Sequence, residues 1–346
     1  MAPSNTARLD GDRRATLVEV AERLGISTAT VSRALNKPHL LSPQTVARVR
    51  AAAEEMDYRP NFLAKNLKTG RTHNVLVVMP RLSPFFLEVF TGIERAANEF
   101  GYFPIIAYSG RDPQREAEYF DQVSSGRADG VLLLSSAFSE KPRPYKYKLP
   151  PIVSVLDADP LDDFPSIRVD HKAAAFAATT HLIKLGHRHI AHITGNMTSP
   201  MALSRQQGFL EAMAAAQLPV DEDSIAIGDF TPESGEVAAR LLLTRRRRAT
   251  AVFAANDETA IGAIKVFLGA GLRIPEDMSV IGFDNQHLGR LYTPALTTVN
   301  VPSFDLGFRS LKRLIELIDG KAAPHEEVLA TQIIARATTA APANQT

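Results

Sequence analysis

The sequence predicts a small all-α unit at the N-terminus, followed by a larger α/β body of two lobes, each with a doubly wound parallel sheet. Three observations lead to this prediction. The length of 346 residues suggests two or three domains. Residues 15–60 show helical periodicity without strand-like alternation. From residue 74 onward, short apolar runs rich in β-branched residues alternate with longer amphipathic stretches, which is typical of parallel strands covered on both faces. The runs include residues 75–79, 105–108, 131–134, 152–156, 190–194, 251–254 and 279–283.

Composition excludes several classes of protein. The apolar fraction of 45% is that of an ordinary globular protein. The absence of cysteine excludes disulfide scaffolds, thiol catalysis and zinc sites with cysteine ligands, and it fits a reducing compartment. Residues 1–16 are polar, so we expect no signal peptide. No run reaches the roughly 18 apolar residues of a membrane span, so we expect no membrane partner and a cytoplasmic location.

Charge is distributed unevenly along the chain. Lys and Arg total 39 and Asp and Glu total 38, which gives a formal net charge of +1. Residues 1–71 hold twelve basic and seven acidic side chains, a net charge of +5, so the rest of the chain carries −4. A basic module on a mildly acidic body indicates an anionic partner for the module, and the near-zero total excludes a sequence-blind basic coat.

The all-α unit begins with two short helices around a tight turn. Apolar residues within 17–24 recur at helical spacing and share one face. Thr16 is suited to cap this helix, with Glu19 at the capping-box position. Gly25 follows where a left-handed turn requires glycine, and Ser27 is suited to cap the next helix.

The second helix has an apolar and a polar face. The side chains that we expect on its outer face are Thr28, Ala29, Ser32 and Arg33. Two helices joined by a glycine turn form a helix-turn-helix, whose second helix can enter the major groove of DNA. Thr28 and Ala29 are small enough to approach thymine methyl groups, and Arg33 can reach guanine or a phosphate. A third helix is expected over about residues 43–56. From helical spacing alone, an unrelated helical hairpin with a solvated polar face remains an alternative.

Longer motifs carry a resemblance to a known family. Residues 29–36, 41–45, 57–61 and 64–70, together with residues 275–284, resemble the LacI/GalR family of bacterial transcription regulators. The match covers essentially the whole chain. The resemblance implies a helix-turn-helix headpiece with a hinge helix, a body like that of the periplasmic binding proteins, and regulation by a small effector.

The family resemblance and the helix-turn-helix together assign DNA contacts to Thr16, Ser27, Thr28, Ala29, Thr30, Ser32, Arg33, Asn36, Tyr58, Asn61, Leu67 and Lys68. Leu67 matches the family leucine that enters the minor groove, and Lys68 matches its neighbour. An apolar wedge of this kind unstacks a base step and kinks the duplex. A hinge helix of about seven residues is too short to be stable alone, which suits a switch. The alternative for Leu67 is an ordinary linker leucine.

The domain boundaries follow from these motifs. We expect a tail over 1–14, the DNA-binding domain over 15–60, the hinge and linker over 61–73, and the effector-binding and dimerisation domain over 74–346. Within this last domain, the first lobe is expected over about 74–168 and 300–325, and the second over about 169–299 and 326–340.

Polar and aromatic side chains lie at the expected carboxyl ends of the body's strands, where open α/β sheets bind ligands. The resemblance assigns effector contacts to Phe85, Phe86, Asp170, Arg205, Phe230, Asn256 and Asp284. Converging carboxylates, an arginine and aromatic rings suit a polar ring with hydroxyl groups, which describes a sugar or a nucleoside. Residues 228–231 and the hinge are most similar to the cytidine-repressor branch of the family, whereas a sugar remains the broader expectation.

Several of these assignments have structural alternatives. Phe86 and Phe230 can be core residues, and Asp170 can be the N-cap of the helix that follows it. Arg205 can lie on a helix surface. Asp257 is expected to cap a helix rather than to contact an effector.

Other motifs are discounted. Four histidines have near metal-ligand spacing, but they lie around a turn between helix and strand that the family shares: His181, His187, His189 and His192. The basic run 245–248 is expected to be a solvated loop. We find no glycine-rich phosphate loop and no set of nucleophile and base, so we expect no metal, no cofactor and no enzymatic activity.

Two rival functions remain. A periplasmic-type sugar-binding protein would share the two-lobed body, but the helix-turn-helix and the polar N-terminus argue against it. An enzyme of doubly wound fold lacks a catalytic constellation. We therefore expect a nucleoid-associated homodimer that binds a pseudo-palindromic operator, most simply as a repressor. The tail after Thr338 has no leucine heptads, so a tetramer built on a C-terminal coiled coil is not expected.

Overall fold

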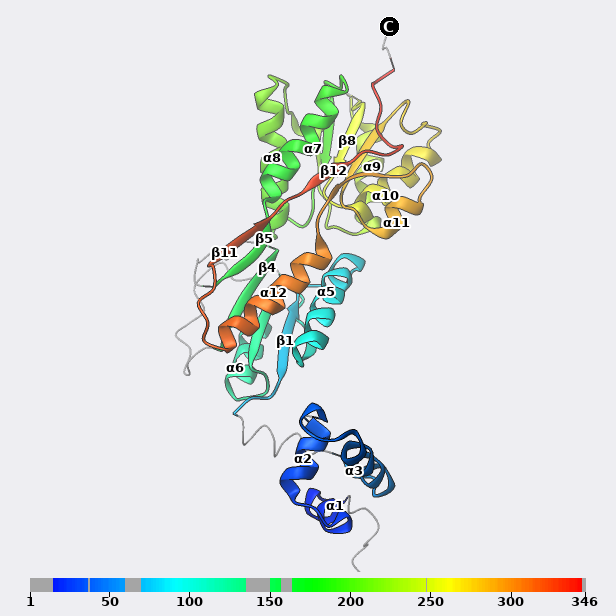
Figure 1. Cartoon of the computed structure of the whole chain (residues 1–346). Helices are drawn as coiled ribbons and strands as arrows, with labels where there is room; N and C mark the ends of the chain where they lie inside the picture. Colours follow the sequence, from blue (N-terminus) through cyan, green and yellow to red (C-terminus); the bar gives the residue numbers. More distant parts are fainter. Residues whose placement is uncertain are drawn as a thin grey trace, which may run out of the picture. The chain divides into compact units, whose positions relative to one another are not determined.

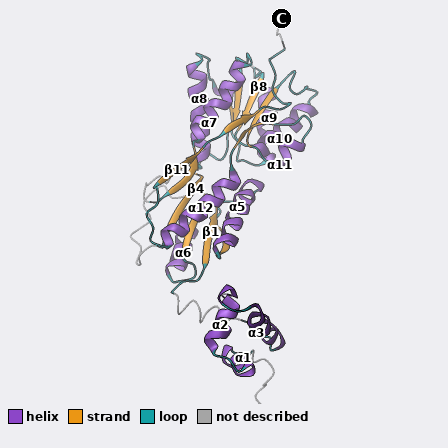
Figure 2. Cartoon of the chain, in the orientation of Figure 1, coloured by secondary structure: helices purple, strands orange, loops and turns teal. Residues whose placement is uncertain are grey.

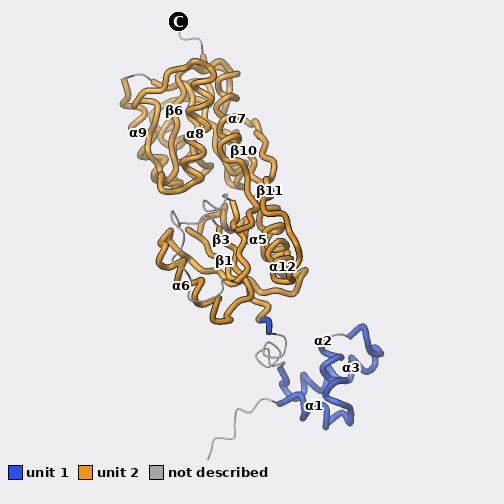
Figure 3. Tube along the Cα trace, turned by 90° about the vertical axis from the view of Figure 1, so that its left-hand side faces the viewer, with its two compact units in different colours: residues 1–71 blue, residues 72–346 orange. Residues whose placement is uncertain are grey.

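The chain forms two compact units, residues 1–71 and 72–346 (Figure 3). The computed structural model describes residues 15–36, 38–59, 70–134, 150–156, 164–246 and 248–343. The division between the units falls where the net charge changes from +5 to −4. Within the described ranges, no helix is long and apolar enough to cross a membrane.

The first unit is a helical headpiece around a small apolar core. Its elements are α1 (Leu17–Leu24), α2 (Thr28–Asn36), the 3-10 turn η1 (Pro38–Leu40) and α3 (Pro43–Glu55). Val20, Val31 and Val49, one from each α-helix, are fully buried against one another. An ion pair of 2.5 Å between Arg23 and Glu55 also joins α1 to α3. The predicted third helix is therefore confirmed.

The turn between α1 and α2 has the predicted signals. The Thr16 hydroxyl accepts a hydrogen bond from the Glu19 amide at 3.3 Å, and the Glu19 carboxylate accepts one from the Thr16 amide at 2.7 Å. Gly25 ends α1 with φ of 64°, in the left-handed region that favours glycine. The Ser27 hydroxyl accepts a hydrogen bond from the Thr30 amide at 3.2 Å and so caps α2. The helix-turn-helix geometry thus follows from local sequence.

The first lobe of the body is a parallel sheet in the order β11-β5-β4-β3-β1-β2 (Figure 1). Its elements are β1 (Asn74–Met79), α5 (Pro84–Phe100), β2 (Phe103–Tyr108), α6 (Pro113–Ser124), β3 (Gly130–Leu134), β4 (Ile152–Leu156), β5 (Ser166–Val169), α12 (Ser303–Ile318) and β11 (Glu326–Leu329). Val77 belongs to the same apolar cluster as α5 and α12, whereas the adjacent Val78 clusters with α6. Because successive side chains point to opposite faces of a strand, helices cover both faces of this sheet (Figure 2).

The second lobe repeats this strand order as β12-β10-β9-β8-β6-β7, with only β12 antiparallel among its described strands. Its elements are α7 (His171–Lys184), β6 (Ile190–Ile193), α8 (Pro200–Ala215), the 3-10 turn η2 (Glu222–Ser224), β7 (Ile225–Ala226), α9 (Pro232–Thr244), β8 (Ala251–Ala254), α10 (Asp257–Gly269), β9 (Ser279–Asp284), α11 (His287–Leu291), β10 (Thr297–Asn300) and β12 (Gln332–Ile334). The predicted fold class, a helical headpiece with two doubly wound lobes, is confirmed.

The chain crosses between the lobes three times. The crossings lie between β5 and α7, between β10 and α12, and between β11 and β12. The third differs from the sequence expectation, which assigned residues 326–340 to the second lobe. Residues 326–329 form β11 and pair with β5 of the first lobe, and Glu326 accepts a hydrogen bond of 2.6 Å from Arg168 there. This pairing holds β11 in the first sheet and moves the boundary to residues 330–331.

Glycines allow close helix contacts in the body. Gly92 of α5 and Gly307 of α12 lie where these helices cross, and a Cβ atom at either position would clash with a backbone carbonyl oxygen of the other helix. Gly208 does the same for α8 against α7. Backbones can approach this closely only because no side chain intervenes.

Candidate functional site

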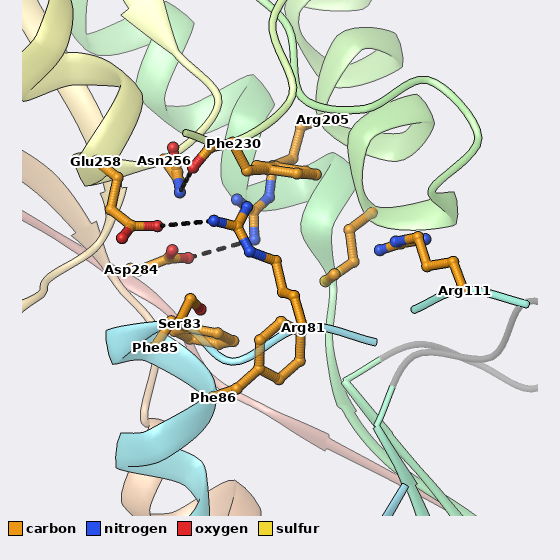
Figure 4. A pocket seen from close by; sticks show the side chains of 11 residues that line it. Arg81, Ser83, Phe85, Phe86, Arg111, Arg205, Phe230, Asn256, Glu258 and Asp284 are labelled. Carbon is orange, nitrogen blue, oxygen red and sulfur yellow. Dashed lines mark hydrogen bonds and ion pairs between the residues drawn. The ribbon is translucent and has the colours of Figure 1, made fainter. Parts of the chain in front are cut away.

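A pocket lies between the two lobes of the body, at the carboxyl ends of strands from both sheets (Figure 4). Its volume is about 340 Å³, open solvent included. The residues that line it are Arg81, Ser83, Phe85, Phe86, Arg111, Met201, Arg205, Phe230, Asn256, Glu258 and Asp284. Six of the seven predicted effector residues are among them. The exception is Asp170.

Arg205 reaches into this pocket from α8 rather than lying on a helix surface. Its guanidinium donates to the backbone carbonyl of Ala255 and lies 3.3 Å from the Asp284 carboxylate. The same group stacks over the Phe283 ring, 3.7 Å from the ring centroid. Only 2% of Arg205 is exposed, so the charge is compensated by partners from several elements of the second lobe.

His171 connects Arg205 to the first lobe. Its Nδ1 atom lies 3.4 Å from an Arg205 nitrogen, and its Nε2 atom lies 3.2 Å from the Leu156 carbonyl oxygen at the end of β4. Burial, and then the neighbouring Arg205 charge, lower the pKa of His171 well below its ordinary value. A neutral ring with the proton on Nε2 satisfies both contacts, because Nδ1 then accepts from the arginine and Nε2 donates to the carbonyl.

Asp284 is the acidic partner in the pocket. Burial raises its pKa to about 7, against the opposing effect of Arg205. Asp257, close by, is fully buried. Its carboxylate accepts hydrogen bonds from the Thr298 hydroxyl at 2.6 Å and from the backbone amide of Gln286 at 2.7 Å. Burial, with the Asp284 charge adding to it, raises the pKa of Asp257 well above its usual range. One of the two carboxyl groups is therefore held inside the lobe rather than in the pocket.

Aromatic rings line the pocket from both lobes. Phe85 and Phe86 contribute from the start of α5, with ring centroids 5.5 Å apart and an edge-on arrangement. Phe230 contributes from the second lobe. The backbone of Phe230 has φ of 73° and that of Asp284 has φ of 105°, values that non-glycine residues rarely adopt. Two strained residues that line one pocket are typical of a functional site.

The predicted cap of α10 is wrong, and one of the two alternatives for Asp170 is observed. Asn256, not Asp257, caps α10: its side chain accepts from the Thr259 amide at 3.0 Å and donates to the Phe230 carbonyl at 3.1 Å. Asn256 thus lines the pocket while its polar atoms hold the fold. Asp170 is exposed and caps α7 by accepting from the Ala173 amide at 2.9 Å. The alternative reading of Asp170, as a helix cap, describes its observed contact.

Sequence reasoning missed five of the lining residues: Arg81, Ser83, Arg111, Met201 and Glu258. Arg81 and Ser83 lie in the loop after β1, and Arg111 follows β2 by three residues. Position after a strand was the available signal, and it could have found these three. Met201 and Glu258 lie near the starts of helices, where position alone does not separate a lining side chain from a solvated one.

The headpiece presents a polar face along the second helix of the motif. Thr28, Ala29 and Arg33 are exposed, and Thr30 and Ser32 are partly exposed. Thr16 and Ser27 are exposed as well, although both hydroxyls serve as helix caps. Major-groove contacts need an exposed face of this kind on a helix whose opposite face is anchored.

Of the remaining predicted DNA contacts, the structure describes the side chain of Tyr58 alone. Tyr58 packs partly buried against the headpiece core, and this burial raises the pKa of its hydroxyl. Asn36 ends α2, and its side chain lies outside the described structure. Asn61, Leu67 and Lys68 lie outside the described residues.

The histidine cluster is used for packing and hydrogen bonding. His187 bonds the Thr250 hydroxyl and the Ala340 carbonyl, each at 2.9 Å, and so holds the C-terminal segment against the second lobe. His192 stacks between Phe209 and Phe253. In the part of the chain that the structure describes, no group of three His, Asp or Glu side chains could hold a metal ion.

Comparisons with known proteins agree with both units. Residues 16–61 match the family described as bacterial regulatory proteins, lacI family, and residues 179–339 match the periplasmic binding protein-like domain. The transcriptional repressor CytR of Escherichia coli K12 is 36% identical over 313 residues, which cover 89% of this chain and 91% of CytR. The repressor PurR of Serratia proteamaculans is 35% identical over 311 residues, with the same coverage.

Solved structures give the same result. The lac repressor dimer bound to operator and the anti-inducer ONPF is 26% identical and has a TM-score of 0.81, with 95% of this chain and 100% of that chain covered. A complex of the transcriptional regulator CelR with cellobiose is 31% identical and has a TM-score of 0.68, with coverage of 94% and 100%. These similarities extend over headpiece and body together.

Proposed function

This chain belongs to the LacI family of bacterial regulatory proteins, and from that membership we propose that it represses transcription at an operator under the control of a small effector. The observation that carries the proposal is the presence, in one chain, of two sites. One is the exposed polar face of a helix-turn-helix, and the other is a polar and aromatic pocket between two lobes. A pocket that only stored or carried its ligand would have no use for a DNA-reading headpiece.

We propose that the second helix of the headpiece reads base edges in the major groove through Thr28, Ala29 and Arg33. Thr16, Ser27, Thr30, Ser32 and Asn36 would hold the phosphate backbone or complete this surface. Tyr58 is partly buried, and for it we propose a DNA contact through the part of its side chain that remains exposed. Asn61, Leu67 and Lys68 would act in the hinge, with Leu67 as the minor-groove wedge.

The operator contacts can be tested by selecting binding sites from random DNA with the full chain and then measuring bending. A pseudo-palindromic site is expected, because two headpieces of a dimer read two half-sites. Leu67→Ala is expected to reduce both affinity and bend angle, since the wedge that kinks the duplex is lost. Leu40→Ala, at an exposed leucine of the headpiece, is the control. Equal bending by wild type and Leu67→Ala would exclude the wedge.

For the effector, we propose a small neutral molecule with a polar ring, either a sugar or a nucleoside. Phe85, Phe86 and Phe230 offer faces for a ring, while Arg205 and Asp284 offer a donor and an acceptor at its edge. The CelR complex contains the sugar cellobiose, and the name of the lac repressor complex includes the anti-inducer ONPF. The nucleoside class is supported only by the resemblance of residues 228–231 and the hinge to the cytidine-repressor branch of the family.

A thermal-shift screen of sugars and nucleosides identifies the effector, because a ligand that binds only the folded state raises the melting temperature. The ligand that raises it is then added to the operator complex. A change in operator affinity is expected, with a reciprocal effect of operator on effector binding. A ligand that binds without any such coupling would contradict the proposed regulation.

We propose a homodimer assembled through the body. The edge strand β2 exposes a run of apolar side chains, namely Phe103, Ile105, Ile106 and Tyr108. The equivalent edge of the second lobe exposes Ile227 after β7 and Val237 on α9. Exposed apolar edges of this kind mark interaction surfaces. The expected mass in analytical ultracentrifugation is that of two chains.

We also propose that the protein is located in the cytoplasm, on the nucleoid.

A further inference from the structure

Two arginines of the first lobe reach across the cleft to the second lobe. Arg81, in the loop after β1, lies 3.7 Å from the Glu258 carboxylate and donates to the Asp229 carbonyl oxygen at 3.3 Å. Arg111, after β2, donates to the Ser199 hydroxyl at 2.9 Å. All three acceptors belong to the second lobe, so the chain's own side chains bridge the cleft at two points.

The Arg81–Glu258 pair is well shielded for an ion pair at a pocket. The side chains are 28% and 14% exposed, respectively. Burial raises the pKa of Glu258, and the Arg81 charge opposes that effect. Removing one charge of a shielded pair leaves the other without compensation, which is costly, whereas fully exposed pairs contribute little. This pair can therefore influence how the lobes close.

The position of Arg81 also affects what the cleft can hold. Figure 4 shows its side chain extending through the pocket toward Glu258, between the phenylalanines of α5 and Arg205. A molecule that enters between Arg81 and Glu258 separates two charges, and each then needs a new partner. A hydrogen-bond acceptor facing the guanidinium and a donor facing the carboxylate would supply both.

We propose that Arg81 and Glu258 form an interlobe gate: their ion pair holds the cleft closed without an effector, and an effector enters by exchanging places with it. The gate rests on the proposed function in that the pocket is the effector site. It selects against apolar molecules of suitable size, because these would leave both charges unpartnered.

The gate can be tested by hydrogen exchange of the full chain without DNA or added ligand. Two peptides report on the cleft: residues 83–87 from the first lobe and 229–234 from the second. Arg81→Glu and Glu258→Arg are each expected to increase exchange about fivefold in both peptides, because the cleft opens more often. The double variant, which reverses the pair, is expected to restore exchange toward the wild-type rate.

Arg115→Glu is the matched control. Arg115 also belongs to the first lobe and also lies 3.7 Å from its acid partner, but it is 56% exposed and its partner Asp112 lies in the same helix turn. Its exchange in both peptides is expected to equal that of wild type, and thermal melting verifies that each variant is folded. Unchanged exchange in the folded single variants, or a double variant as fast as the singles, would overturn the gate. Because no effector or operator is used, this result is independent of whether the proposed function holds.

Discussion

Arg205 serves both the pocket and the stability of the second lobe. It lines the pocket, but its guanidinium is also bonded to Ala255 and Asp284 and stacked on Phe283. A variant that removes the arginine therefore affects more than effector binding. Any loss of regulation has to be separated from a loss of folding free energy.

Arg205→Ala is expected to lower the free energy of unfolding by about 3 kcal/mol, because it removes the ion pair with Asp284, the hydrogen bond to Ala255 and the stacking on Phe283 from a buried site. Adding Asp284→Asn, which removes the acidic partner of the lost arginine, is expected to recover part of this loss. Denaturant unfolding of the single and double variants provides the measurement. The structural role of the pair is wrong if Arg205→Ala unfolds at the same denaturant concentration as wild type.

His192 predicts a pH dependence of stability. It is fully buried, and burial lowers its pKa to about 4. The unfolded chain binds the proton near pH 6.5, so stability is lost as the pH falls from about 6.5 to 4, by up to about 3 kcal/mol. His192→Phe, which keeps the stacking on Phe209 and Phe253, is expected to lose less stability over this range.

The pH experiment compares unfolding free energies of wild type and variant at each pH, since other buried histidines contribute to both proteins. His39→Phe, at an exposed histidine of the headpiece, serves as the control. Parallel pH profiles for wild type and His192→Phe would rule out this assignment.

At the residue scale, the sequence predicted which residues line the pocket better than it predicted which groups each of them contacts. Arg205 and Asp284 were found because charged residues at strand ends or in a family motif stand out. Two alternatives stayed open for Asp170, and the cap predicted at Asp257 was wrong. An aspartate before a helix can serve as cap, core residue or ligand group, and only tertiary packing decides between these roles. Arg81 was missed because its role depends on Glu258, which lies far away in sequence and in the other lobe.

At the scale of elements, the crossing of α5 and α12 depends on glycine. Gly92→Ala is expected to lower the free energy of unfolding by about 1–3 kcal/mol, because a methyl group there collides with the Phe304 carbonyl and forces the helices apart. Gly269→Ala, at the end of α10 in open space, is the matched control. That substitution is expected to be neutral or slightly stabilising. Thermal melting distinguishes the two; equal effects would contradict the close-crossing explanation.

Buried strands in the middle of each sheet were predicted well. The run 152–156 coincides with β4 and the run 251–254 with β8, because buried parallel strands are nearly continuous apolar stretches. The short strands β7 and β12 were not predicted. With two and three residues, they carry too little pattern, and their pairing is fixed by neighbouring strands.

At the scale of the whole molecule, the separation of charge predicts how operator binding responds to salt. The headpiece unit carries the basic excess, so operator affinity is expected to fall steeply between about 50 and 200 mM salt. The logarithm of the association constant should fall against the logarithm of the salt concentration with a slope of about −0.9 for each phosphate contacted. Arg33→Ala is expected to weaken binding, whereas Arg240→Ala, an exposed arginine of the body, is expected to leave affinity and slope unchanged. Fluorescence anisotropy over a salt series checks both. A salt-independent affinity would exclude the headpiece charge as a contributor.

The three crossings between the lobes also constrain how the body is made. The first lobe needs α12 and β11, which lie beyond residue 302, so its sheet cannot be completed until almost the entire chain has left the ribosome. The headpiece, contained within residues 1–71, has no such requirement. During synthesis it can fold many seconds before the body, at roughly 5–20 residues added per second. A nascent chain would thus hold a folded headpiece while its body, residues 72–346, is still incomplete.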